Sequence, residues 1–589
     1  MKSVIFKDFS FTYLHQEEQA LSNITLELDE GRVIGIIGRA GAGKSTLVKA
    51  LDGLVPQVEL GLQNGDVIVD GKNTREHEVN QMAYHVGLVL QNPEIQIFSL
   101  RVKDDVAFGP ANLGVPKDEI FRRVEVALRE TELEHLAERN PNDLSGGEQQ
   151  SLAIAGLLAM QPKVMAFDEP ISMLDPLGKE QVMNVMRQVT KRNGTTSITT
   201  EAGSDIEAVA EVVDHLVAIH DGRVVLEGTP EEVLQTDLME EIGVGRPQVT
   251  ELFIKLKRKG FEFEHIPITL EQAYQFLKAR LVKESVKKIR RPVWMEAEQA
   301  MQPEFGETVI EVENLHHFYN PSVHALKGVS FTIPKGQIVG IIGQNGSGKT
   351  TLARHLVGLL KPTNNEEAKL RVLGEDITKL RIDKIIKKIN YVFQNPDDQL
   401  FAETIWDEIA FAPKMMDLDE DEIARLTEEA LKVFELDKHA DRYVFGLDED
   451  LKTYLAISCI LPLQPEVLLI DEPTTGLDTH GEARMMQSLT RLRDEMGKTI
   501  VIITHNMKTV GNHCDRVLVM SKGNMILDGA PREIFAKDKE LLEGDIRPPQ
   551  ITRLGQLLAQ EFGCPKDVLT VDEMVEILAY SLNPENQGV

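Results

Sequence analysis

A long internal repeat constrains this chain more than any other feature. The matching segments are 33–54 with 338–359, 86–98 with 391–401, and 164–176 with 467–479. Lys349 follows Lys44 by 305 residues, and Asp471 follows Asp168 by 303, so the offset is nearly constant. The 589 residues therefore form two related halves, each long enough for at least one ordinary domain.

The order of apolar segments within each half indicates the fold class. Runs rich in β-branched residues, such as RVIGIIG at 32–38, KVMAFD at 163–168 and TIVIIT at 499–504, alternate with helical patterns. Buried strands that alternate with helices are typical of an α/β fold with a parallel sheet. We therefore predict two α/β domains in tandem.

A second, weaker repeat closes each half. Thr269 and Thr570 each precede an apolar-periodic run, with Gln272 or Glu573 three residues later, which is the pattern of a helix capping box. This predicts a small helical appendix that either stabilises the chain or mediates dimerisation. The predicted divisions are 1–235 (first domain), 236–285 (first appendix), 286–306 (linker), 307–535 (second domain) and 536–589 (second appendix).

Composition favours some classes of function over others. Asp and Glu outnumber Lys and Arg by 94 to 64, a formal charge of −30 that argues against nucleic acid as a partner. The three cysteines show no metal-ligand or disulfide spacing, which favours a reducing compartment. No run approaches the roughly 18 apolar residues of a membrane helix, so we expect a soluble or peripheral protein, cytoplasmic in location.

Two glycine-rich loops carry the clearest chemical signal. Residues 38–45 and 343–350 both fit G-x-x-x-x-G-K-[ST], and each follows a strand pattern and opens a helix. Glycines let consecutive backbone N–H groups point at phosphate oxygens. Lys44 and Lys349 would neutralise phosphate charge. A glycine turn with no ligand is the alternative, but two matches in register argue against it.

An acidic pair follows each loop at a matching distance. Asp168-Glu169 and Asp471-Glu472 each end an apolar run. A carboxylate at the end of a central strand can hold Mg²⁺, and the next can polarise an attacking water. A lone pair of this kind is often only surface, but here both pairs lie downstream of a phosphate loop.

With LSGGE at 144–148 upstream of the first acidic pair, both halves resemble the ATP-binding-cassette ATPases. The resemblance implies P-loop NTPase domains paired head to tail, with two ATP molecules between them. Each site would use the phosphate loop of one half and the LSGGE signature of the other. Tyr13 and Tyr319 match the aromatic that stacks on adenine, although either is also a reasonable strand-core residue.

The resemblance implies a full set of site residues. The ATP contacts are Tyr13, Gly38, Gly41, Gly43, Lys44, Ser45, Thr46, Ser145, Gly146, Gly147, Glu148, Tyr319, Gly343, Gly346, Gly348, Lys349, Thr350 and Thr351. The Mg²⁺ site residues are Ser45, Gln91, Asp168, Thr350, Gln394 and Asp471. The catalytic residues are Glu169, Lys349, Gln394, Glu472 and His505, the last in the position of the histidine that contacts the γ-phosphate.

A narrower resemblance concerns the segments after the two glutamines. QNPEIQIF at 91–98 and QNPDDQLF at 394–401 look like the energy-coupling-factor (ECF) importers, whose ATPases also carry a C-terminal appendix. This implies an integral-membrane T component, a substrate-binding S component and a place at the cytoplasmic face of the membrane. The cargo, a vitamin, a vitamin precursor or a transition-metal ion, stays open. The alternative is a soluble twin-cassette ATPase that acts on ribosomes or nucleic acid; drug exporters usually carry fused membrane domains.

The two halves differ in their signatures. LDEDL at 447–451 stands where the first half has LSGGE, so three carboxylates, Asp448, Glu449 and Asp450, replace Ser and Gly. Carboxylates repel a phosphate and leave no room for it. Asp caps a helix as well as Ser does, so we predict that the helix survives while phosphate recognition is lost.

The first half also lacks the histidine. It reads SITTEAGSD at 197–205 where the second reads VIITHNM at 501–507, so either Glu201 or Ala202 takes the position of His505. In the head-to-tail arrangement both losses fall in the site of Lys44. We therefore expect the site of Lys349 and Glu472 to do nearly all the hydrolysis, with slow turnover at Glu169 left open.

Overall fold

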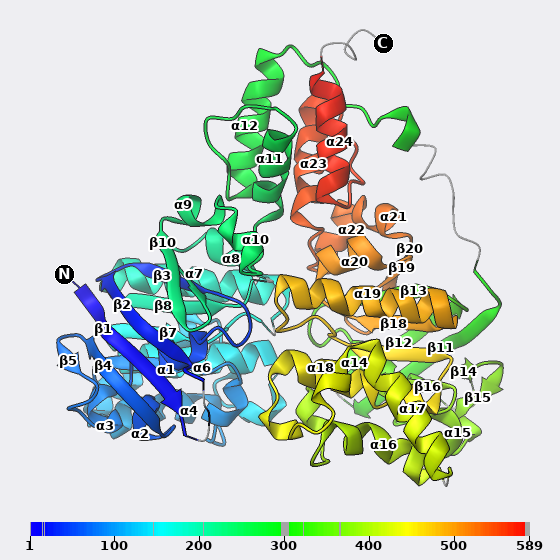
Figure 1. Ribbon diagram of the computed structural model, residues 1–589, viewed down its shortest axis with the longest axis horizontal. Helices are drawn as coiled ribbons and strands as arrows, with labels where there is room; N and C mark the ends of the chain where they lie inside the picture. The colour runs from blue at the N-terminus through cyan, green and yellow to red at the C-terminus, as the bar shows by residue number, and fades with distance from the viewer. Residues whose placement is uncertain are drawn as a thin grey trace. The chain divides into compact units, whose positions relative to one another are not determined.

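The computed structural model describes residues 2–14, 16, 18–144, 146–172, 174–203, 205–295, 305–321, 323–364, 367–416 and 418–583 (Figure 1). These residues form two compact units. The first comprises Met1–Lys257, Glu262–Ala273 and Gly476–Thr479; the second comprises Arg258–Phe261, Tyr274–Thr475 and His480–Val589. The predicted α/β fold class is confirmed, because each unit contains a six-stranded, mainly parallel sheet beside a four-stranded antiparallel one.

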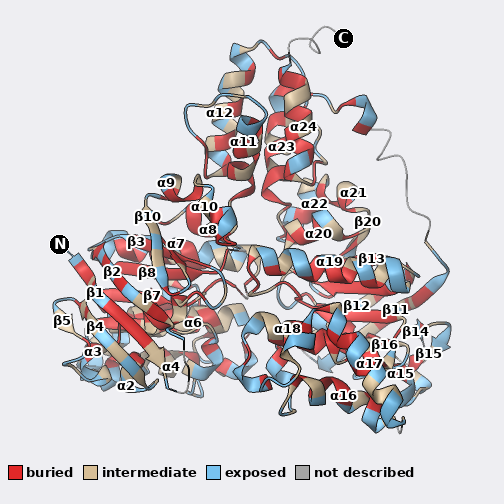
Figure 2. Cartoon of the chain, viewed as in Figure 1, coloured by how far each residue is buried: buried red, intermediate tan, exposed pale blue. Residues whose placement is uncertain are grey.

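The first unit contains two sheets. Their strands are β1 (Lys2–Tyr13), β2 (Leu21–Asp29), β3 (Val33–Ile37), β4 (Gly61–Val69), β5 (Lys72–Asn73), β6 (Val86–Val89), β7 (Val164–Phe167), β8 (Thr196–Glu201), β9 (His215–His220) and β10 (Arg223–Gly228). The antiparallel order is β2-β1-β4-β5, and the larger sheet runs β10-β9-β3-β8-β7-β6. Its central strands are buried along their whole length, as continuous apolar runs in parallel sheets require (Figure 2).

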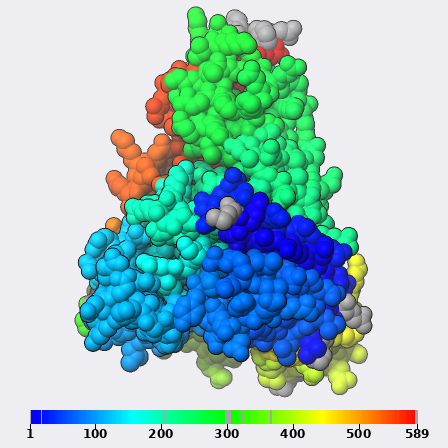
Figure 3. All heavy atoms as spheres, turned by 90° about the vertical axis from the view of Figure 1, so that its left-hand side faces the viewer, coloured from blue at the N-terminus to red at the C-terminus, as the bar shows by residue number. Residues whose placement is uncertain are grey.

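Helices cover the larger sheet and form a separate layer. They are α1 (Lys44–Lys49), α2 (Leu54–Gln57), α3 (Val79–Met82), α4 (Val102–Asn112), α5 (Lys117–Glu130), α6 (Gly146–Met160), α7 (Pro176–Asn193), α8 (Ile206–Ala210), α9 (Pro230–Leu234) and α10 (Leu238–Glu241). One core fills the space between the two sheets, a second lies under α7 and α8, and a third joins α4, α5 and α6. In the space-filling view the surface of the first unit runs from dark blue through cyan to green (Figure 3).

The second unit repeats this arrangement. Its strands are β11 (Thr308–Asn320), β12 (Val323–Pro334), β13 (Ile338–Gly343), β14 (Lys369–Val372), β15 (Glu375–Asp376), β16 (Ile389–Val392), β17 (Val467–Asp471), β18 (Thr499–Ile503), β19 (Arg516–Ser521) and β20 (Asn524–Gly529). The sheet orders are β12-β11-β14-β15 and β16-β17-β18-β13-β19-β20. The same strand order in both units is the structural counterpart of the sequence repeat.

The helices of the second unit follow the same sequence of elements. They are α14 (Lys349–Leu356), α15 (Ile382–Ile385), α16 (Ile405–Met415), α17 (Glu420–Val433), α18 (Glu449–Ser458), α19 (Thr479–Met496), α20 (Met507–His513), α21 (Pro531–Phe535), α22 (Asp538–Glu543), α23 (Gln550–Phe562) and α24 (Val571–Leu582). An apolar core packs α14 against the two sheets. Among the described residues, no helix is both long and apolar enough to cross a membrane.

The appendices are helical pairs, as the capping patterns predict. The first consists of α11 (Gln248–Arg258) and α12 (Leu270–Lys283), the second of α23 and α24. Thr269 and Gln272 form the reciprocal capping box, with both backbone-to-side-chain hydrogen bonds at 3.3 Å. Thr570 Oγ1 likewise accepts from the backbone N–H of Glu573 at 3.1 Å. The finer division of the chain into five parts stays a prediction.

Part of the predicted linker is anchored to the second appendix. Arg291, which is 11% exposed, pairs with Asp567 at 2.9 Å and with the buried Glu573 at 2.7 Å. The backbone N–H of Ile289 donates to the carbonyl of Phe562 at 2.7 Å. Two carboxylates thus accept from the terminal nitrogens of one guanidinium, a charge-assisted arrangement that fixes the side chain. Residues 289–291 are therefore a packed segment rather than a loose connection.

Candidate functional site

The first phosphate loop joins β3 to α1, as the sequence predicts. Gly43 has a φ of 101°, and a Cβ there would lie 2.6 Å from the carbonyl oxygen of Ala20, so only glycine fits. Lys44 is buried, and its Nζ donates to the carbonyl oxygens of Gly38 and Arg39 at 2.9 and 3.1 Å. The ammonium group is thus held over the loop by the loop's own carbonyls, where it can neutralise phosphate charge.

The second loop, between β13 and α14, repeats this geometry. Gly348 has a φ of 102°, and a Cβ there would lie 2.7 Å from the carbonyl oxygen of Ala325. Lys349 Nζ donates to the carbonyl oxygens of Gly343 and Gln344 at 2.7 and 2.9 Å. Both loops therefore have the backbone and the cation that a bound phosphate needs.

Each loop hydroxyl lies beside the aspartate of its acidic pair. Ser45 Oγ donates to Asp168 Oδ1 at 3.0 Å, and Thr350 Oγ1 donates to Asp471 Oδ2 at 3.4 Å. Hydroxyl and carboxylate oxygens are ligands that Mg²⁺ prefers. The residues present therefore fit the cation implied by the resemblance, and the tertiary structure brings each predicted pair together across more than a hundred residues of chain.

A second hydroxyl holds each aspartate, and these partners are missing from the sequence predictions. Thr200 Oγ1 on β8 donates to Asp168 at 2.8 Å, whereas the phenol of Tyr391 on β16 donates to Asp471 at 2.7 Å. Burial and the adjacent Glu472 raise the pKa of Asp471 to about 6. The polar run TSITTE, all buried in a central strand, was the available signal for Thr200.

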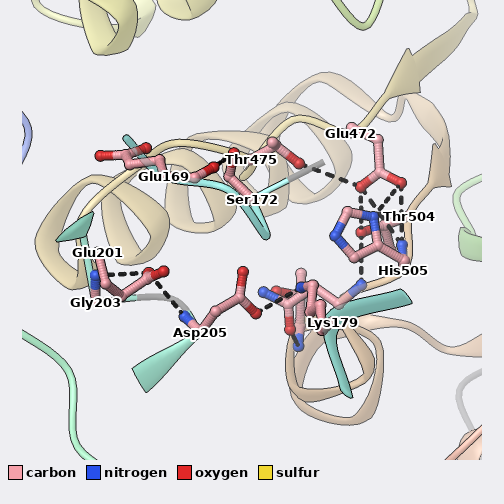
Figure 4. Close-up of polar contacts among 12 residues, drawn as sticks. Glu169, Ser172, Lys179, Glu201, Gly203, Asp205, Glu472, Thr475, Thr504 and His505 are labelled. Carbon is pink, nitrogen blue, oxygen red and sulfur yellow. Dashed lines mark hydrogen bonds and ion pairs between the residues drawn. The ribbon is translucent and has the colours of Figure 1, made fainter. Parts of the chain in front are cut away.

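The glutamate of the second unit is held from four directions (Figure 4). Its carboxylate accepts from the His505 backbone N–H at 3.1 Å, from Thr504 Oγ1 at 2.9 Å and from Thr475 Oγ1 at 3.4 Å, and it lies 2.7 Å from His505 Nδ1. Burial alone would raise the pKa of Glu472. The His505 imidazole, Lys349 and Thr504 outweigh burial and hold the pKa below its usual value.

The glutamate of the first unit has different partners. Glu169 Oε1 forms an ion pair with Lys44 Nζ at 3.2 Å, and Glu169 Oε2 accepts from Gln91 Nε2 at 3.4 Å. Burial, together with the neighbouring Asp168, raises the pKa of Glu169, although Lys44 opposes the shift. The backbone at both glutamates is left-handed, with φ of 43° at Glu169 and 51° at Glu472. Such strain in non-glycine residues concentrates at functional sites.

Strand register settles which residue stands at the histidine position of the first unit. In the second unit Ile341 on β13 pairs with Ile503 on β18, two residues before His505. The corresponding Ile36 on β3 pairs with Thr200 on β8. Ala202 therefore takes the position of His505, and Glu201 takes the position of Thr504.

Glu201 is a buried carboxylate that turns back on its own loop. Its Oε1 accepts from the backbone N–H groups of Gly203 and Asp205 at 3.0 and 3.1 Å (Figure 4). Burial, with Asp205 and Glu169 nearby, raises the pKa of Glu201 to about 8. Asp205 in turn pairs with Lys179 at 2.6 Å. The sequence has Ala202 where the second unit has His505, and no contact of an imidazole with Glu169 is found among the described residues.

The signature segments both begin helices. In the second unit Asp448 caps α18, where its Oδ1 accepts from the backbone N–H of Leu451 at 3.0 Å. This confirms that the acidic replacement preserves the helix. In the first unit α6 starts at Gly146, and a Cβ on Gly146 would meet open space. Gly147 and Glu148 lie in its first turn, and Ser145 lies outside the described residues.

The remaining predicted residues are placed less uniformly. Tyr13 is half-buried, and its hydroxyl lies 2.9 Å from Thr46 Oγ1. Tyr319 is 50% exposed, and its hydroxyl lies 3.2 Å from Thr351 Oγ1. Both tyrosines therefore border a phosphate-loop helix, while the first also packs on the core between the sheets. Gln394 is exposed.

Comparison with known families agrees with this geometry. The family described as "ABC transporter" matches residues 21–172 and 326–475, one match in each unit. Both matches contain a phosphate loop and end just beyond an acidic pair.

Relatives of similar length match almost the whole chain. A putative ABC transporter ATP-binding protein of Caldanaerobacter subterraneus subsp. tengcongensis is 37% identical over 98% of both chains. One from Methanosarcina mazei is 35% identical and covers 98% of this chain and 97% of its own.

A solved structure was also found, of CbiO1 from Clostridium perfringens, described as part of the ABC transporter complex cbiONQ. It is 36% identical and covers 42% of this chain and 99% of its own, with a TM-score of 0.38, too low for the likeness to support any conclusion. The family match and the full-length relatives are sufficient: the chain belongs to the ABC transporter family, as an ATPase with two ATP-binding domains.

Proposed function

We propose that this chain is the ATP-hydrolysing subunit of an ECF-type membrane importer, with two composite ATP sites of unequal activity. In the head-to-tail pairing that the family resemblance implies, the first site combines Lys44 and Glu169 with the LDEDL segment. The second combines Lys349 and Glu472 with LSGGE. The second site performs nearly all the hydrolysis, and the first mainly holds ATP.

The contrast between the two glutamates carries this proposal. Glu472 is oriented by His505 and Thr504, and its pKa is lowered, so it is an ionised and fixed acceptor. Glu169 is paired with Lys44, the cation that the phosphates need, and its pKa is raised. A general base has to be ionised and held within reach of its water. Glu472 meets these conditions better than Glu169.

The roles of the second-site residues follow from their contacts. Glu472 orients the attacking water and accepts its proton, while Lys349 and His505 stabilise the charge that develops on the phosphoryl group. Gln394 contributes to the water and cation environment. Ser145, Gly146 and Gly147 would close the site across the pairing.

A magnesium ion would be held by Thr350, Asp471 and Gln394 in the second site. Ser45, Asp168 and Gln91 are the counterparts in the first. When bound, the ion neutralises phosphate charge. The buried hydroxyl donors on each aspartate, Tyr391 and Thr200, keep its carboxylate oriented for that purpose.

The same substitution in both units tests the asymmetry. We expect Glu472→Gln to lower the ATPase rate by about a hundredfold or more, because general acid–base contributions are typically 10²–10⁴-fold. Glu169→Gln should lower it less than about twofold. Retained nucleotide binding, followed with a fluorescent ATP analogue, shows that each variant is folded. Equal losses would refute the asymmetry.

A groove in the first unit supports a membrane partner. A cavity of about 780 Å³ lies between the layer of α4 and α6 and the sheet edge at β6. Its walls are largely apolar and include Leu88, Leu152 and Met160, and the exposed Tyr84, Phe98 and Phe108 stand among its lining. Apolar clefts with exposed aromatics are typical of binding sites for another chain.

The second unit has the same pair of aromatics. Phe98 and Phe108 pack edge to face at 4.3 Å, and Phe401 and Phe411 do so at 4.7 Å, and all four are substantially exposed. Each pair follows in sequence the Q-N-P segment that begins with the glutamine of its own site. We assign these surfaces to cytoplasmic segments of the T component, which would thereby sense nucleotide state.

Membrane association tests this assignment. In cells that make the T and S components, we expect the chain to co-purify with membranes and with a small integral-membrane protein. Phe98→Glu with Phe108→Glu should reduce that association. Phe121→Glu is the matched control, because Phe121 is equally exposed in the same unit but does not line the cavity. Recovery on ribosomes at low salt would instead support the soluble twin-cassette alternative. Mass spectrometry of the captured S component would identify the cargo class.

A further inference from the structure

The loop after β8 in the first unit differs in construction from its counterpart after β18. Asp214 and Asp515 mark the same point in the two units, because each accepts from the first backbone N–H of the adjacent strand, at Val33 and Ile338 respectively. Asp214 stands 12 positions after Ala202, whereas Asp515 stands 10 positions after His505. The first loop is therefore two residues longer.

In the second unit this loop is tied to the catalytic glutamate. The backbone N–H and the imidazole of His505, together with the Thr504 hydroxyl, all reach the Glu472 carboxylate. Any change in the position or charge of Glu472 therefore changes the hydrogen bonds of the loop. The loop and the glutamate form one coupled network.

In the first unit the corresponding bonds close within the loop. Glu201 Oε1 accepts from the backbone N–H groups of both Gly203 and Asp205. Gly203 has a φ of 116°, and a Cβ there would lie 2.9 Å from the backbone nitrogen of Gly245, so the turn depends on glycine. The Asp205 carboxylate is occupied by Lys179. These contacts satisfy the backbone N–H groups of Gly203 and Asp205 and the Asp205 carboxylate without a bond to Glu169.

We propose that Glu201 is a positioning residue that closes the loop after β8 on itself and so uncouples this loop from Glu169 and the nucleotide. This inference rests on the proposed function, since it explains how the first site can hold ATP while the loop after β8 does not respond to the γ-phosphate. The carboxylate takes the position of Thr504, yet it bonds to the loop rather than to the acidic pair.

The charges around Glu201 agree with a structural rather than a ligand-binding role. Glu169 and Asp205 are the anionic neighbours, while Lys44 and Lys179 are each engaged by one of them. Glu201 adds no positive charge that would attract a phosphate to this position. The backbone N–H groups of residues 203 and 205 are the donors that Glu201 can satisfy, and it satisfies both.

Amide hydrogen exchange on the full chain tests the proposal. The N–H groups of Gly203 and Asp205 are compared with those of His505 and Asn506, without nucleotide, with ADP, and with a non-hydrolysable ATP analogue. We expect exchange at the first pair to be slow and to change less than about twofold among the three states. Exchange at the second pair should change by about tenfold or more, because those groups bond within the Glu472 network.

Two substitutions test whether Glu201 causes the slow exchange at Gly203 and Asp205. Glu201→Gln keeps an oxygen acceptor in the same place and should preserve slow exchange at Gly203 and Asp205. Glu201→Thr introduces the residue of the second unit, whose hydroxyl is too short to reach both groups, and should accelerate exchange by about tenfold or more. It should also make exchange depend on nucleotide.

Two outcomes would overturn the proposal. One is wild-type exchange at residues 203 and 205 that follows nucleotide as strongly as at 505 and 506. The other is unchanged slow exchange in Glu201→Thr. Neither reading depends on hydrolysis. Failure of the proposed function appears separately, as equal ATPase losses in Glu169→Gln and Glu472→Gln, so the two failures are distinguishable.

Discussion

Replacing Glu201 by glutamine should stabilise the first unit in a strongly pH-dependent manner. The folded carboxyl has a pKa of about 8, against about 4.5 for an ordinary glutamate. The folded state therefore keeps a proton that the unfolded state releases, and stability falls as pH rises through this window. Below about pH 4.5 both states are protonated, so the effect vanishes there.

The magnitude follows from the two pKa values. At about 1.36 kcal/mol per pKa unit, the penalty is below about 1 kcal/mol at pH 5, about 3 kcal/mol at pH 7 and nearly 5 kcal/mol at pH 9. Glutamine cannot ionise and escapes this penalty. For a domain of this size each kcal/mol shifts Tm by roughly 2–4 °C, so the advantage of the variant should grow by about 10 °C between pH 5 and pH 8.5.

Thermal unfolding followed by circular dichroism at several pH values is a suitable assay. Glu94→Gln is the matched control, since it makes the same chemical change at an exposed position of the same unit. Any fixed cost of burying the new amide shifts Tm equally at every pH. The dependence of the Tm difference on pH therefore tests the prediction. A Tm difference between Glu201→Gln and wild type that stays constant or shrinks as pH rises would refute the reasoning.

Two further predictions concern other parts of the chain. In a Glu472→Gln background, which silences the second site, replacing residues 447–451 by LSGGE should restore little hydrolysis at the first site. Adding Ala202→His should raise that rate further. Full recovery of hydrolysis with LSGGE alone would show that the histidine is dispensable. Arg291→Met removes a guanidinium that bridges Asp567 and the buried Glu573, whereas Arg532 still pairs with Glu573 at 2.7 Å. We therefore expect the second appendix to lose about 2 kcal/mol of stability, measured as faster proteolysis between residues 286 and 306. Unchanged cleavage would show that Ile289 and its neighbours anchor this segment without the ion pairs.

The sequence determined the features that depend on local pattern. The two phosphate loops and the acidic pairs were predictable because each is a short run of neighbouring residues with one physical purpose. The repeat was found because such runs recur at a nearly constant offset. The helix after Asp448 was predictable for the same reason, since a cap and the N–H group that it satisfies lie three residues apart. Two alternatives that sequence left open, Glu201 or Ala202 at the histidine position, differed only by a gap in an alignment.

Only the tertiary structure decided how these parts meet. Strand register places Ala202 at the position equivalent to His505, because pairing with β3 fixes the register of β8 regardless of the longer loop that follows. Thr200 and Tyr391 reach equivalent aspartates from different strands, a substitution that no pattern along the chain predicts. Glu169 and Glu472 follow similar apolar runs and an aspartate, yet their pKa values shift in opposite directions. Their partners, Lys44 and His505, come from distant segments that only folding brings to them.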